Sequence, residues 1–523
     1  MRRSVYRRVL LGLLGLGLTL RLLGLGWGLP GQVSPDEPPF HPDEHEAFVG
    51  AATLYGDPPA ATFNKGGALY VRLAFVARAL VRAALDPSPA REYAATLVVL
   101  RALNAAFALA AALLAAGLGR QVGGPLVGLG AAALLLSFPG AVLDAHYARP
   151  DVAGACLATA ALFCAGGAAR EGGRRWLALG GLFAGLATAA LLSGAVALAA
   201  LAAGALEWHR RGARPGWARA FVGSLAWLAA FALAGWLLGN LEALLHPRAW
   251  LGGLGIASST HGAGGWSPPL PQLGRVAFYA FGSIAAAAGY LGIPVLLLSR
   301  APGSAAIVAY LLCGYAALGR VGFDMMRHLE FLAAPTAIAA SAALVAGARR
   351  LGRRTGRAEL AAGGALALAA LLAGQLSLAY VWPLQFGEDV RYRTGRWLIE
   401  HAAPGASVGV TASFYGDETY APRFPGPHEL RTFRLMLRRN HDASGYLDLG
   451  LDYIATTDFA KTRASGPSAP AFFRGLFAGD RYQLAAEIGP AWDPLCLPDR
   501  LGSQRPGDLL YLRSTFYVFE RRP

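Results

Sequence analysis

Long apolar runs recur through this chain and decide what it can fold into. Stretches rich in Leu, Ala and Gly, each about 20 residues long, follow one another as far as residue 382. That is the length a helix needs to cross the hydrocarbon core of a bilayer. The mean hydropathy of +0.40 agrees with this pattern, which predicts an α-helical polytopic membrane protein with about eleven transmembrane helices. The expected spans are Val9–Leu29, 95–118, 125–143, 152–169, 176–191, 194–208, 218–240, 276–298, 304–320, 328–347 and 360–382.

Basic residues set the expected orientation. The first apolar run follows MRRSVYRR and lacks a small-residue cleavage site, which is typical of an uncleaved signal anchor with a cytoplasmic N-terminus. Threading the spans from there places the arginine-rich connections, such as 170–175 and 349–357, inside at every turn. The net charge of +15 therefore indicates membrane topology, and no nucleic-acid partner is expected.

Acidic residues and cysteines narrow the function further. Nearly all acids of the membrane part fall on the outer side, an asymmetry that membrane insertion does not require, so the outer face is expected to be the working one. The four cysteines form no CxxC motif, which argues against thiol redox chemistry and against a cysteine zinc site.

The chain divides into two expected domains. A membrane domain covers 1–384 and includes a first outer loop at 30–94, in which the arginine-bearing apolar stretch Gly66–Leu85 favours a helix lying in the outer interface. From about Phe386 the composition changes, which predicts a soluble α/β domain over 385–523, placed outside by the odd number of spans. Its expected strands are Ser407–Ala412, Asp452–Thr456, Leu509–Leu512 and Phe516–Phe519.

The most informative motif is HPDEH in the first outer loop. Asp43 and Glu44 are candidate catalytic carboxylates, because partial burial at an interface raises the pKa of a carboxylate towards that of a useful general base. A simpler explanation is helix-start chemistry, in which Pro42 stands at the first helical position and acids fill the first turn. That explanation leaves the flanking His41 and His45 unaccounted for, and we expect both to contact substrate. A divalent metal is a possible cofactor here, although alternate positions on a helix do not converge three ligands.

Basic residues elsewhere in the outer segments are candidate phosphate ligands. Lys65 and Arg72 could neutralise a lipid-linked phosphate, or Lys65 could simply anchor the chain at the headgroups. In AHYARPDVAG, an ion pair between Arg149 and Asp151 either holds a functional site in place or fixes the packing of a helix. In FDMMRHLEFLAAP, Arg327 is the best second phosphate contact, since a guanidinium grips phosphate with two hydrogen bonds, and His328 lies beside it. The loop at 242–272 is either a lid or a connector.

Several short motifs together resemble the GT-C superfamily of glycosyltransferases, and within it the bacterial dolichyl-phosphate-mannose protein mannosyltransferase-like and aminoarabinose-transferase-like group. They are HPDEH, FNKGGALYVRL, VVLRALNAAF with Arg101, HYARPD, RHLEFLAAP and, near the C-terminus, WLIEHAAPGASVGV, LDYIATTDF and FFRGLF. The sequence departs from relatives at LLSGA (Leu191 to Ala195), where many have a lysine or tyrosine, and at Asn64 to Gly66, where many read NYP.

The resemblance implies a polytopic enzyme of the bacterial inner membrane that uses a polyprenyl-phosphate sugar donor. Transfer to a lipid, glycan or protein acceptor would take place at the periplasmic face, with Asp43 as base and Glu44 supporting it. Two rival functions stay open at this point. A lipid or solute transporter would place ionisable residues at the bilayer midplane within inverted repeats, neither of which is apparent. A non-catalytic cell-envelope assembly protein would depend on the domain after Phe386 and not on Asp43.

Overall fold

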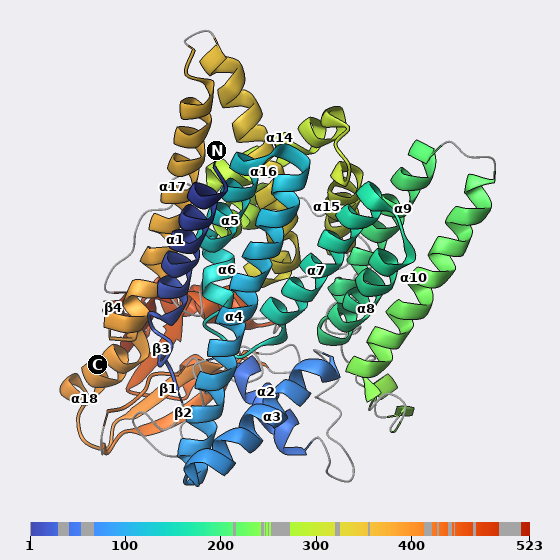
Figure 1. The fold of residues 1–523 in the computed structure, drawn as a ribbon. Helices are drawn as coiled ribbons and strands as arrows, with labels where there is room; N and C mark the ends of the chain where they lie inside the picture. The colour runs from blue at the N-terminus through green and yellow to red at the C-terminus, as the bar shows by residue number, and fades with distance from the viewer. Residues whose placement is uncertain are drawn as a thin grey trace.

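The protein is described here from a computed structural model (Figure 1). It describes residues 2–29, 41–53, 67–212, 216–241, 245, 247–248, 250–252, 272–319, 325–353, 356–386, 388–412, 421–425, 428–437, 442–443, 445–463, 467–490 and 514–523. Lys65, the predicted strand at Leu509–Leu512 and most of the 242–272 loop lie outside these residues.

The N-terminal three quarters of the chain form a helical bundle, as the apolar runs predict. Its α-helices are α1 (Arg3–Leu22), α2 (Pro42–Thr53), α3 (Ala68–Leu85), α4 (Pro89–Gly123), α5 (Pro125–Ser137), α6 (Pro139–Asp144), α7 (Pro150–Glu171), α8 (Arg174–Ala190), α9 (Ala197–Gly212), α10 (Trp217–Gly239), α13 (Ala277–Phe281), α14 (Ser283–Ser299), α15 (Ser304–Leu318), α16 (Glu330–Gly352) and α17 (Ala358–Phe386). Shorter helical turns precede three of them: η2 (Leu192–Val196), the π-helical η3 (Gln272–Val276) and η4 (Met326–Leu329).

The chain is a multi-pass membrane protein, but the count of eleven spans is not confirmed. Among the described residues, six helical segments are long and apolar enough to cross a membrane, or seven if one bent pair counts as a span. Helices α5 and α15 are apolar but have only 13 and 15 residues. At 1.5 Å per residue, 15 residues extend about 22 Å, less than the roughly 30 Å hydrocarbon core.

The expected span at 276–298 is broken. Helices α13 and α14 meet at Gly282 with a bend of 118°. Gly282 has φ +79, a conformation that residues with a Cβ rarely adopt, so this glycine permits the break. The sequence pattern alone predicts one continuous span here because both halves are apolar.

Small residues allow helices α8 and α10 to pack closely at the edge of the bundle. A Cβ added at Gly185 of α8 would lie 2.1 Å from the carbonyl oxygen of Ala232 in α10. A Cβ at Gly235 would lie 2.3 Å from the carbonyl oxygen of Leu182. Such close backbone approach is how membrane helices associate without a hydrophobic driving force.

We therefore expect Gly185→Ala to destabilise the bundle by about 1–3 kcal/mol, the usual cost of overpacking. The measurement is the thermal unfolding midpoint of the detergent-solubilised protein. Gly223→Ala on α10 is the matched control, because a Cβ there meets nothing within 4 Å. Equal midpoints for the two variants would contradict the close contact.

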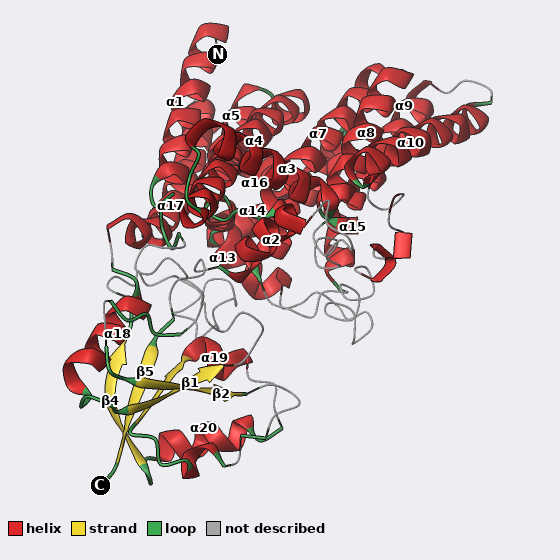
Figure 2. Ribbon diagram, turned by 90° about the horizontal axis from the view of Figure 1, so that it is seen from below, coloured by secondary structure: helices red, strands yellow, loops and turns green. Residues whose placement is uncertain are grey.

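The C-terminal domain is a five-stranded mixed sheet with helices on both faces (Figure 2). Its strands are β1 (Ser407–Ala412), β2 (Arg431–Met436), β3 (Tyr453–Thr457), β4 (Tyr482–Ile488) and β5 (Phe516–Arg521), in the order β2-β1-β3-β5-β4. β1 pairs in parallel with β2 and β3, whereas β5 pairs antiparallel with β3 and β4. The helical elements are α18 (Val390–His401), η7 (Tyr446–Asp448), α19 (Asp458–Arg463) and α20 (Ala469–Ala478).

Two apolar layers hold this sheet between α18 and α20. Leu398 of α18 packs in one cluster with Val408 and Val518, and Phe472 of α20 packs in the other with Ile454 and Phe519. The alternation follows from the two-residue repeat of a strand, which sends successive side chains to opposite faces.

Helices α2 and α3 and the C-terminal sheet lie at one end of the bundle, and the N-terminus lies at the other (Figure 1). The last turn of α16, which contains Arg349 and Arg350, lies at the N-terminal end as well. The acidic helix α2 and this basic helix end are therefore at opposite ends of the bundle.

Candidate active site

Helix α2 carries the HPDEH motif and is built as its residues predict. Proline starts the helix at Pro42, and Asp43 and Glu44 fill the first turn, where carboxylates stabilise a helix N-terminus. Its apolar side, with Ala47 and Ala51, packs against α3 and α4. This packing fixes which acids face inward and which stay accessible.

Asp43 lies at the meeting point of three segments that are far apart in sequence. Its Oδ2 accepts a hydrogen bond from Nη1 of Arg327 in η4 and lies 3.6 Å from Nη1 of Arg149, just before α7. The Asp43 side chain keeps 35% of its surface exposed, whereas Arg149 is buried and Arg327 nearly so. The carboxylate is thus held by buried cations yet open to a substrate.

Arg149 is the hub of this cluster. It donates to Asp144 Oδ1 at 2.5 Å, its Nε lies 3.6 Å from Asp151 Oδ2, and its Nη1 donates to Nε2 of His41 at 3.1 Å. The guanidinium also lies 4.9 Å from the centre of the Tyr147 ring, a cation–π distance. One arginine therefore binds the predicted Asp43, His41 and Asp151 together.

The electrostatics of the cluster favour an ionised Asp43 and a neutral His41. Withdrawal from solvent raises the pKa of Asp43, but the guanidinium of Arg327, with His41 and Arg149, outweighs this and holds that pKa well below its usual range. Burial, and then the positive charge of Arg149, hold the pKa of His41 well below its usual range. His41 is therefore an uncharged hydrogen-bond acceptor here, and the positive charge of the cluster comes from the arginines.

Glu44 is placed differently from Asp43. It is fully buried and forms a two-point ion pair with Arg101 of α4, with Nε–Oε1 at 2.9 Å and Nη2–Oε2 at 2.8 Å. Its Oε1 also accepts the backbone N–H of Ala148 at 2.7 Å. Arg101 donates in turn to the carbonyl oxygens of Leu25 and Trp27, each at 2.7 Å. These contacts fasten α2 to the bundle through Glu44.

The other predicted substrate ligands among the described residues are His45, Arg72 and His328. Nδ1 of His45 is hydrogen-bonded to the hydroxyl of Tyr93 at 2.9 Å. Arg72 of α3 donates to the carbonyl oxygen of Leu238 at 2.6 Å, near the end of α10. His328 lies half-buried in η4 beside Arg327. For His45, Arg72 and His328 a substrate contact stays a prediction.

Sequence reasoning did not assign roles to Asp144, Arg101 or Asn104. Asn104 of α4 donates to the carbonyl oxygens of Tyr147 and Arg149, at 2.7 and 3.0 Å, and so holds this segment in place. The signal for both was available, since Asp144 directly follows the apolar run 125–143 and Arg101 lies inside the run 95–118, where charged residues are rare. Their partners could not be known from sequence because they come from distant segments.

The described residues do not present a formed metal site. Among them, no group of three or more His, Cys, Asp or Glu side chains is arranged to hold a metal ion. Asp43, Asp144 and Asp151 all face guanidinium groups instead. A divalent ion would have to compete with Arg149 for each of them.

Solved structures with a similar fold are membrane transferases. Oligosaccharyltransferase AglB from Archaeoglobus fulgidus, in complex with an inhibitory peptide and a dolichol-phosphate, has a TM-score of 0.51 and 15% identity, over 89% of this chain and 72% of its own. ArnT from Cupriavidus metallidurans, bound to undecaprenyl phosphate, has a TM-score of 0.53 and 11% identity, over 97% of both chains. This chain has the GT-C fold.

The GT-C fold confirms the architecture that the short motifs suggested, including the C-terminal α/β domain. An oligosaccharyltransferase of Archaeoglobus fulgidus in complex with Zn and sulfate has a TM-score of 0.50 and 16% identity, over 97% of this chain and 76% of its own. No protein-family model matches the chain, and no curated protein matches it in sequence.

Proposed function

We propose that this protein is a glycosyltransferase that moves a sugar from a polyprenyl-phosphate carrier to an acceptor at the periplasmic face of the bacterial inner membrane. The observation that carries the proposal is an exposed carboxylate, Asp43, paired with Arg327 and Arg149 in a GT-C fold. Two proteins of similar fold were solved with dolichol-phosphate or undecaprenyl phosphate. The position of α2, at the opposite end from the N-terminus and from the basic last turn of α16, supports the periplasmic orientation.

Asp43 and Arg327 have different roles in the proposed reaction. The acceptor hydroxyl attacks the anomeric carbon and gives its proton to the Asp43 carboxylate, while the bond from that carbon to the phosphate oxygen breaks. The electron pair leaves with the lipid phosphate, whose added negative charge Arg327 stabilises. Lys65 and Arg72 are further proposed contacts for this phosphate.

Arg327 also controls the basicity of Asp43. While Arg327 pairs with Asp43, the pKa of the carboxyl stays low and the group is a weak base. A lipid phosphate that draws the guanidinium to itself would release Asp43 and raise its pKa. Donor binding would thereby prepare the base, which ties proton transfer to the presence of the donor.

The test is incubation of the purified full-length protein in lipid nanodiscs with a panel of polyprenyl-phosphate sugars, scored by mass spectrometry for sugar transfer or hydrolysis. Each donor is run with and without chelator. We expect loss of sugar from at least one donor together with release of the free lipid phosphate. Flux of an intact lipid in proteoliposomes without any glycosyl product would instead favour a transporter.

Arg327→Met should weaken donor use strongly. A hydrogen bond to a charged group contributes about 1.5–3 kcal/mol, so we expect kcat/KM for the donor to fall by roughly 10- to 100-fold. The matched control is Arg82→Met, because Arg82 also pairs with a carboxylate, Glu92, near the same end of the bundle but is 60% exposed. An equal loss for both variants would remove Arg327 from donor binding.

A further inference from the structure

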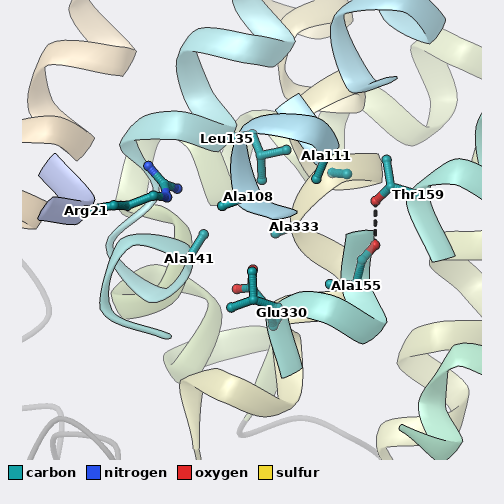
Figure 3. A pocket seen from close by; sticks show the side chains of 11 residues that line it. Arg21, Ala108, Ala111, Leu135, Ala141, Ala155, Thr159, Glu330 and Ala333 are labelled. Carbon is teal, nitrogen blue, oxygen red and sulfur yellow. Dashed lines mark hydrogen bonds between the residues drawn. The ribbon is translucent and has the colours of Figure 1, made fainter. Parts of the chain in front are cut away.

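A second pair of opposite charges lies deeper in the bundle. Arg21 of α1 is completely buried, and Glu330, the first residue of α16, is 7% exposed. Both line one cavity together with Thr159 of α7 and small side chains from α4, α6 and α16. Figure 3 shows the guanidinium and the carboxylate on opposite sides of this cavity, with alanine side chains between them.

Arg21 is only partly satisfied by the protein. Its Nη1 donates to the carbonyl oxygens of Gly17 and Leu136, both at 3.1 Å. Its Nε and Nη2 are buried and have no hydrogen-bond partner. An arginine buried in an apolar bundle with two unpaired N–H groups is costly unless something else binds them.

The cavity has room for one small polar molecule. The space that the centre of a water molecule can occupy is about 10 Å³, close to the minimum that one ordered water needs. Such a water requires two or more polar partners, and the free N–H groups of Arg21 and the Glu330 carboxylate provide them. Thr159 is already engaged, since its hydroxyl donates to Ala155 at 2.7 Å (Figure 3).

Glu330 is directly linked to the candidate site. It follows η4, and Arg327 stands three residues before it on the same continuous helical segment. Arg21 and Glu330 line the same small cavity, and opposite charges across such a space in an apolar bundle attract each other. An attraction that holds the first turn of α16 towards α1 also fixes where η4 presents Arg327 to Asp43.

We propose that this cavity is an internal water site and that Arg21 and Glu330, bridged by its water, position Arg327 against Asp43. The proposal rests on the function proposed above, because it gives the two residues a role in setting the Asp43–Arg327 contact. Neither residue touches substrate, and both act as positioning residues.

The first test is a double-mutant cycle on the thermal unfolding of the detergent-solubilised full chain. Arg21→Met and Glu330→Gln should each lower the unfolding midpoint, because each leaves a buried charge without its opposite. The double variant should be more stable than either single variant, since both charges are gone. Losses that simply add would overturn the charge pair.

The second test follows the protonation of Asp43 by infrared difference spectroscopy in nanodiscs between pH 3 and pH 7, with the band assigned by its absence in Asp43→Asn. In the unaltered protein Asp43 should stay ionised over this range. In Glu330→Gln, and in the double variant despite its recovered stability, Asp43 should protonate within the range, because Arg327 is no longer held in place. An Asp43 that remains ionised in Glu330→Gln would overturn the positioning role.

Thr336→Val is the matched control on the same helix. Thr336 is buried at 2% exposure, its hydroxyl is unpaired, and it does not line the cavity. It should leave the protonation of Asp43 unchanged, and a shift equal to that of Glu330→Gln would mean a general loosening of α16 and would overturn the proposal. Neither test uses a sugar donor. The transferase assay can therefore fail while the stability and infrared tests succeed, or the reverse, so the two proposals are tested separately.

Discussion

Asp43→Asn is expected to abolish sugar transfer while the protein stays folded and inserted in the membrane. The amide keeps the shape of the carboxylate but cannot take the acceptor proton, and general base catalysis typically contributes about 100- to 10,000-fold. Because buried Arg149 keeps its pairs with Asp144 and Asp151, the substitution does not leave that charge uncompensated. The measurement is the rate of product formation by mass spectrometry, beside the thermal unfolding midpoint of the same preparation.

Glu92→Gln is the matched control for Asp43→Asn. Glu92 also lies at this end of the bundle and is also paired with two arginines, Arg78 and Arg82. Turnover of the Glu92 variant should stay near that of the unaltered protein. If Asp43→Asn turned over at the original rate, Asp43 would have no part in the mechanism.

Arg101→Met should have the largest effect on folding. Arg101 and Glu44 are both completely buried, and removing one partner of a buried ion pair costs about 3–5 kcal/mol because the other charge is left uncompensated. The substitution also removes the donor to Leu25 and Trp27. We expect a strongly lowered unfolding midpoint and rapid proteolysis near α2.

The pair Arg349 and Glu359 is the control, because it has nearly the same two-point geometry at 2.8 and 3.1 Å but is largely exposed. Arg349→Met should change stability by about 1 kcal/mol or less.

Glu44→Gln distinguishes a structural from a catalytic role of Glu44. Turnover per folded molecule should be nearly normal if Glu44 only positions α2, and a loss as deep as that of Asp43→Asn would make Glu44 a catalytic residue.

Sequence reasoning predicted the parts of this fold that depend on local pattern. The apolar runs predicted most of the helices, and the strands β1, β3 and β5 were predicted because they lie in the middle of the sheet and are largely buried. Strands β2 and β4 were missed. Both are edge strands with exposed side chains, such as Phe433 and Leu484, so they lack the apolar run that marks a buried strand.

The candidate site could be predicted as a set of charged residues but not as an arrangement. HPDEH, HYARPD and RHLEF were all recognised, yet the partners of Glu44 and Asp43 depend on helix packing between residues that lie 57 and 284 positions apart. Asp43 and Glu44 are neighbours in sequence, but the angle of roughly 100° between successive residues of a helix directs Glu44 to buried Arg101 and leaves Asp43 accessible. A local pattern cannot separate two adjacent carboxylates in this way.

Trp27 contacts both domains, one through its backbone carbonyl oxygen and the other through its indole ring. Its carbonyl oxygen accepts a hydrogen bond from Arg101, while its indole ring lies 5.8 Å from the guanidinium of Arg391 in α18 and 6.3 Å from the ring of Tyr147. Tyr147 in turn lies 4.4 Å from the ring of His41. A chain truncated before α18 would expose this indole, so the sheet domain and the helical bundle are matched to each other at Arg391 and Trp27.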